Sequence, residues 1–139
     1  MLAVVLLLLV ACASDDQDPG LQPAEPDPEP ELVRMLVLTS AGGEVSPTAY
    51  DVDDRTQMRA YVRTFEDRDQ ATSALRAAVR EAGDRGRLVA ATVAVGCDVP
   101  RDVEVSGADG APEVRPAKVA TPEVECFAPM TSVALVRLP

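Results

Sequence analysis

Beyond its N-terminal segment, the chain carries three near-continuous apolar runs, at residues 32–39, 88–96 and 131–138. Each run has eight or nine residues and contains β-branched side chains. Apolar runs of this length predict buried strands rather than helices. We expect the run at 32–39 to lie centrally in a sheet.

Two segments between the first two runs show the spacing of amphipathic helices. Asp53 precedes the first segment as a candidate N-cap, the phase breaks at residues 66–69, and Gly83 suits the end of the second helix. The apolar side of the first helix consists of Met58, Tyr61, Val62 and Phe65. The apolar side of the second consists of Ala71, Ala74, Leu75, Ala78, Val79 and Ala82.

A hairpin is expected between the second and third runs. Residues 102–105 alternate as a half-exposed strand should, residues 106–110 have turn composition, and a return strand follows at 113–119. Pro116 places that return strand at a sheet edge. The order of elements predicts an α+β fold, in which two helices pack on one face of a mixed four- to five-stranded sheet. Residues 32–139 would form this single small domain.

The N-terminus has an apolar run at residues 2–10, too short for the roughly 20 residues that span a bilayer but suited to the core of a signal peptide. Its end and the two residues after it, residues 9–12 (Leu-Val-Ala-Cys), resemble the lipobox of bacterial lipoproteins. The resemblance implies cleavage between Ala11 and Cys12, a signal peptide at 1–11, and lipid on Cys12. Membrane lipid would then be a partner, and two acyl chains suffice to anchor the protein stably at the extracytoplasmic face of the cell membrane.

Other interpretations of this segment remain open. Ala11 and Ala13 satisfy the small-x-small rule of ordinary signal peptidase, with cleavage before Ser14 and a soluble secreted product. No basic residue precedes the apolar run, so the usual positive region of a signal peptide is missing. That absence fits a start codon further upstream or inefficient export. A third interpretation of the segment is an incidental apolar N-terminus on a cytoplasmic protein.

Residues 12–31 comprise the candidate lipidated cysteine and a tether. They hold seven acids and no base, and five of the twelve prolines. This composition predicts a disordered or polyproline-like segment, whose 19 residues after Cys12 reach about 60 Å at roughly 3.1 Å per residue. The rest of the chain has sixteen acids and thirteen bases without a basic stripe, which argues against a nucleic-acid partner.

Cys97 and Cys126 are the cysteines left once Cys12 is assigned to lipid. An even remainder in an exported chain predicts a structural disulfide, and neither cysteine has the C-x-x-C partner typical of redox sites. The chain has no His, which removes the commonest general base, the usual zinc ligand and every Ser-His-Asp arrangement. We expect no catalytic residue, no metal ligand and no cofactor.

Two groups of charged residues have simpler interpretations than a binding site. Residues 51–54 (Asp-Val-Asp-Asp) could supply oxygens to Ca²⁺ but lack the pattern of an EF-hand loop, so helix capping is preferred. Arginines interleave with acids along the first helix and its end, which indicates a solvated surface. These arginines are Arg55, Arg59, Arg63 and Arg68.

The sequence therefore favours a non-enzymatic domain that binds an envelope protein or a cell-wall component. An envelope hydrolase of unfamiliar type, which would need a cleft with convergent carboxylates, is one alternative, and a purely structural spacer is another. The folded part resembles, in general style, uncharacterised small lipoproteins of GC-rich, actinobacterial-type bacteria, chiefly at residues 96–100 and 126–129. The resemblance implies no particular activity.

Overall fold

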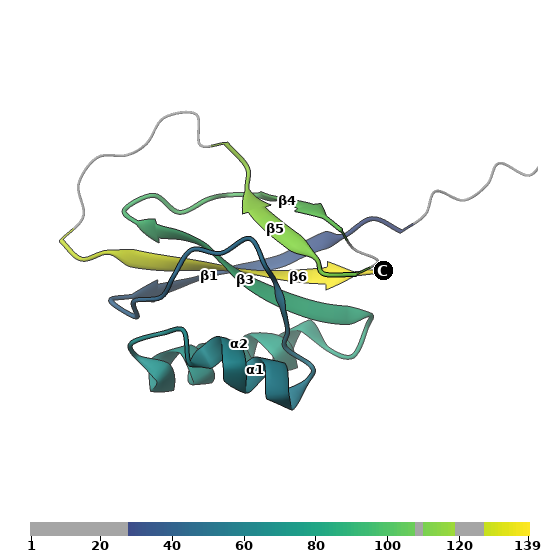
Figure 1. Ribbon diagram of the computed structural model, residues 1–139, viewed down its shortest axis with the longest axis horizontal. Helices are drawn as coiled ribbons and strands as arrows, with labels where there is room; N and C mark the ends of the chain where they lie inside the picture. Colours follow the sequence, from purple (N-terminus) through teal and green to yellow (C-terminus); the bar gives the residue numbers. More distant parts are fainter. Residues whose placement is uncertain (1–27, 108–109, 119–126) are drawn as a thin grey trace, which may run out of the picture.

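The computed structural model describes residues 28–107, 110–118 and 127–139, which fold into three layers. Two helices cover one face of a four-stranded sheet, and a two-stranded hairpin covers the other (Figure 1). The elements are β1 (Glu31–Thr39), β2 (Tyr50–Asp51), α1 (Arg55–Val62), α2 (Arg68–Ala82), β3 (Arg87–Gly96), β4 (Val103–Ser106), β5 (Glu113–Pro116) and β6 (Met130–Leu138). The predicted α+β fold, with two helices on one face of the sheet, is confirmed.

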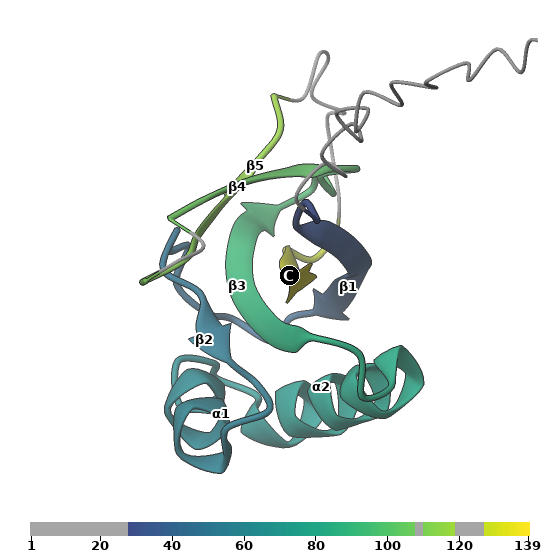
Figure 2. The same ribbon diagram turned by 90° about the vertical axis from the view of Figure 1, so that its right-hand side faces the viewer.

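The C-terminal strand β6 lies inside the sheet. The strand order is β1-β6-β3-β2, and all three pairings are antiparallel. β1 and β3 run in the same direction, but β6 enters between them and pairs with both (Figure 2). For that reason the sheet, which we expected to be mixed, has only antiparallel pairs among its described strands.

The prediction that residues 32–39 lie centrally is wrong, because β1 is an edge strand. Most of its side chains are half-buried or exposed, whereas residues 131–136 of β6 are all buried. Charged side chains are typical of sheet edges, and β1 contains Glu31 and Arg34. Arg34 forms an ion pair with Glu81 of α2.

The first helix begins one residue later than its predicted cap implies. The Asp54 carboxylate accepts hydrogen bonds from the backbone N–H groups of Thr56 and Gln57, both at 2.8 Å, so Asp54 is the N-cap. Asp53, the predicted cap, instead accepts a hydrogen bond from the backbone N–H of Leu88 at 2.9 Å. This contact ties the start of α1 to β3.

The second helix begins and ends as predicted. Asp67 accepts a hydrogen bond from the backbone N–H of Gln70 at 2.9 Å, and Gly83 ends the helix with a φ of 70°, which glycine adopts without strain. The predicted apolar sides of both helices are confirmed. Every member is buried or packs partly buried in the same core cluster.

Tyr61 of α1 organises the core between the helices and the sheet. Its ring stacks on Tyr50 of β2 with centroids 4.9 Å apart and meets Phe65 edge-on at 5.2 Å. Its hydroxyl is hydrogen-bonded to that of Thr92 on β3, with the oxygens 2.9 Å apart. Burial raises the pKa of Tyr61 well above its ordinary value, so the hydroxyl stays protonated. These contacts fix α1 over β2 and β3.

The hairpin of β4 and β5 packs on the sheet instead of extending it. Val103, Val105 and Val114 face the second core cluster, which is built on β3 and β6. The predicted alternation of the first hairpin strand is confirmed. β5 ends at Pro116, short of the predicted residue 119, which lies outside the described residues together with part of the predicted turn.

Candidate functional site

The residues expected to carry the anchor lie outside the described part of the chain. They are Ala11, Cys12 and the rival cleavage position before Ser14. Lipidation, signal cleavage and the extracytoplasmic location therefore remain predictions. Within the described residues, no helix has the length and apolar content needed to cross a membrane.

The predicted disulfide lies only partly within the described residues. Cys97 directly follows β3, whereas Cys126 is outside them. The β3–β6 register pairs Gly96 with Met130, so the chain before Cys97 lies beside the chain that follows Cys126. This proximity suits a bridge between the two cysteines, and the bridge itself stays a prediction.

The carboxylates of the acidic segment before α1 accept hydrogen bonds from within the domain. Asp51 accepts hydrogen bonds from the backbone N–H groups of Asp53 at 3.0 Å and Asp54 at 3.1 Å, and from Arg87 Nε at 2.8 Å. Burial would raise the pKa of Asp51, but the hydrogen bonds from Arg87, Asp54 and Asp53 outweigh it and hold the pKa below its ordinary value. These contacts support the capping interpretation over the Ca²⁺ interpretation. In the described residues, no three His, Cys, Asp or Glu side chains are grouped as a metal site.

A polar hollow of about 610 Å³ lies at the start of α2. Its lining residues are Ser40, Glu66, Asp67, Arg68 and Asp69. The backbone N–H groups of Glu66 and Asp67 donate to the Ala41 carbonyl at 2.9 and 3.1 Å, and the Asp67 carboxylate caps α2. The hollow therefore lies at the turn between the helices. The Asp67 carboxylate and the backbone N–H groups of Glu66 and Asp67 already have hydrogen-bond partners.

The free side of β1 is the feature most suited to recognition. β1 pairs with β6 along one side only, and alternate N–H and C=O groups of an edge strand point away from the sheet. Between Leu32 and Leu38, the described residues give β1 no backbone hydrogen-bond partner outside β6. A partner that satisfies such groups must itself be an extended polypeptide.

The two halves of β1 differ in how strongly they are protected against pairing with another strand. The first half contains Glu31, Arg34 and a register irregularity between Leu32 and Arg34, all of which discourage pairing. The second half is a continuous apolar segment, Met35–Leu38, in which the Val37 side chain is 43% exposed. We refer to residues 35–38 as the open edge.

Sequence reasoning missed the open edge because it placed this run inside the sheet. The available signal was Arg34, since a charge within an apolar run is typical of an edge strand. No family model, no curated protein and no solved structure matches the chain.

Proposed function

We propose that this protein is an exported lipoprotein, anchored at the extracytoplasmic face of the membrane through Cys12, whose domain binds another envelope protein by strand addition. The open edge is the observation that carries the binding proposal, because it offers unpaired backbone groups beside apolar side chains. The lipobox-like residues 9–12 and the acidic tether support the anchor. A cell-wall glycan lacks the regularly spaced N–H and C=O groups that a strand edge needs, so we favour a protein partner.

Replacing Cys12 should release the protein from the membrane. The chain and its Cys12→Ala variant would be expressed in a GC-rich Gram-positive host, and intact masses measured for membrane and medium fractions. We expect a diacylglyceryl mass on a chain that starts at Cys12, lost in the variant, because acylation needs the thiol. Ser14→Ala is the control and should stay anchored. A mature chain that starts at Ser14 would contradict the anchor and support free secretion.

Crosslinking should place the partner along the open edge. A photo-reactive residue at Val37 of β1 should form adducts with an envelope protein in intact cells. The same residue at Val45 is the matched control, because Val45 is 52% exposed but lies between β1 and β2, outside every described strand. The substitution Leu36→Lys introduces a charge of the kind that keeps natural edge strands from pairing with other strands. Adding it should abolish the Val37 adduct. Equal adducts at both positions, or none at Val37, would refute strand addition.

A further inference from the structure

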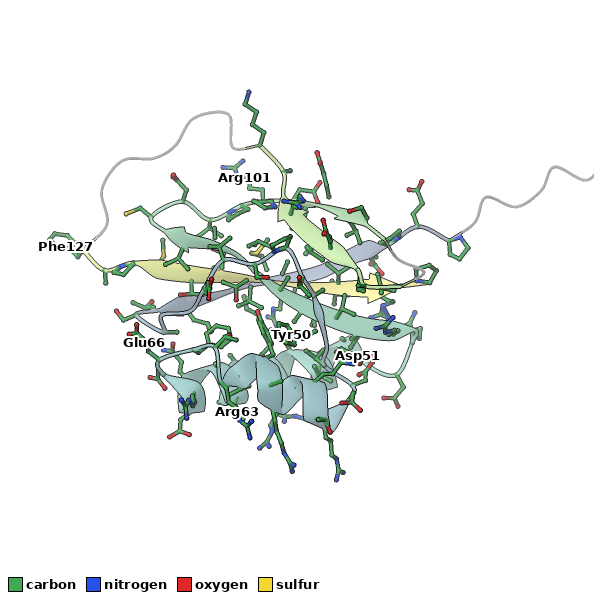
Figure 3. All side chains as sticks on the ribbon, in the orientation of Figure 1. Tyr50, Asp51, Arg63, Glu66, Arg101 and Phe127 are labelled. Atoms are coloured by element: carbon green, nitrogen blue, oxygen red, sulfur yellow. The ribbon has the colours of Figure 1, made fainter. Side chains whose placement is uncertain are left out.

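The outer surface of the helix layer carries five exposed arginines. Three are spaced four residues apart along α1 and its C-terminal cap, and two are one turn apart on α2, so each set lies along one side of its helix. They are Arg55, Arg59, Arg63, Arg76 and Arg80, which we call the arginine face. The opposite sides of the helices, with Tyr61 and Leu75, are buried against the sheet. Figure 3 shows Arg63 extending away from the sheet, beyond the helix layer.

The arginines of the arginine face differ from other arginines of the domain in their ion pairs. Ion pairs in the described part of the chain engage Arg34, Arg87, Arg115 and Arg137, none of which belongs to this face. Five guanidinium groups are therefore presented to solvent without an acidic partner from the described residues.

The acids of the helix layer are held mainly at helix ends or in other contacts. Asp54 and Asp67 cap the helices, Asp53 accepts from the backbone of β3, and Glu81 pairs with Arg34. Asp69 shares the outer side of α2 but lies in its first turn, two turns before Arg76. Two further exposed acids follow the arginines of the two helices in sequence, Glu66 three residues after Arg63 and Asp84 four residues after Arg80, and the ion pairs of the described residues include neither. Between these acids, the five arginines form a positive strip along the helix layer.

We propose that the arginine face binds the anionic head groups of the membrane to which the protein is anchored. Guanidinium groups form paired hydrogen bonds with phosphate oxygens, and several basic groups near an anionic surface act together. The proposal rests on the anchor of the proposed function, because a tether of about 60 Å keeps the domain within reach of the lipid surface. Docking through the helices would turn the hairpin layer away from the membrane and leave the edge of the sheet accessible.

Vesicle flotation tests this inference independently of lipidation. The probe protein is the mature chain from residue 12 with Cys12→Ala, mixed with vesicles of phosphatidylglycerol and phosphatidylcholine or of phosphatidylcholine alone. We expect flotation only with the anionic vesicles, and weaker flotation as salt rises. The triple variant R55A/R59A/R63A should lower the partition coefficient by about 100-fold, since each arginine near an anionic surface contributes about five-fold.

A variant with the same charge change serves as the control. R101A/R115A/K118A also removes three positive charges, but from exposed positions in and near the hairpin layer, and should float nearly as the parent does. The arginine-to-alanine changes favour helix formation, and circular dichroism would verify that every variant is folded. Equal losses of vesicle binding in both triple variants would show that binding depends on net charge and not on the arginine face, and would overturn the proposal.

Two further outcomes would also overturn the inference. One is the absence of flotation of the parent at low salt. The other is binding to soluble poly(glycerol phosphate) without binding to vesicles, which would assign the face to an anionic polymer. Failure of the anchor alone looks different, because the protein would carry no lipid in cells while its unlipidated form still binds anionic vesicles.

Discussion

Leu135→Ala should lower the free energy of unfolding by about 3 kcal/mol, within the range of about 2 to 5 kcal/mol for leucine truncations in protein cores. Leu135 is fully buried on β6, where it pairs with Ala90 of β3 and Arg34 of β1. The helix-side core around it contains several alanines, including Ala71 and Ala78 of α2. Short alanine side chains cannot reach into the vacated space, so most of the cavity would persist.

Urea denaturation followed by circular dichroism would measure this loss. Leu36→Ala is the matched control, because it removes the same atoms from a partly buried position on the edge strand β1. We expect the control to lose clearly less stability, since its site is already open to solvent. Similar losses in the two variants would contradict the central role assigned to β6.

Removing the predicted disulfide should cost about 3 to 4 kcal/mol by the chain-entropy model, for a loop of about 30 residues between Cys97 and Cys126. The loop contains the hairpin, and the β3–β6 ladder holds the chain together near the two ends of the loop. The loss is a large share of the roughly 5 to 15 kcal/mol by which small domains are stable.

The double variant Cys97→Ser with Cys126→Ser, compared with the parent with and without reductant, would measure this effect. The reduced parent should match the untreated double variant in unfolding free energy, and reductant should leave the variant unchanged. Alkylation of the denatured, unreduced parent should label neither Cys97 nor Cys126. Labelling of both cysteines would show that the bridge does not form.

The two proposed surfaces are compatible in space because they use different parts of the fold. Helices α1 and α2, which carry the arginine face, cover one face of the sheet, whereas the open edge belongs to β1 at the side of the sheet (Figures 1 and 2). A domain docked through its helices could therefore still add a strand from a partner protein. A substitution that abolishes one contact should leave the other measurable.

The helices were predictable from the sequence because their determinants are local. Tyr61 and Phe65 lie four residues apart. Asp67 begins α2 through a hydrogen bond to the backbone three residues later, and Gly83 ends it through its positive φ. The first cap was misplaced by one residue because the alternative partner of Asp53 is Leu88, 35 residues later. A contact of that separation leaves no trace in local spacing.

The sequence by itself predicted both helices and five of the six described strands, all but the two-residue strand β2, and it carries the proposal of an anchor at Cys12. Only the tertiary structure decided that β6 is central and β1 is at the edge, because apolar runs of similar length can occupy either position. The choice depends on which strands pair, and that pairing joins residues about 100 positions apart, such as Leu36 and Val133. The same pairing exposes the open edge, and the packing of the helices gathers the five arginines onto one face.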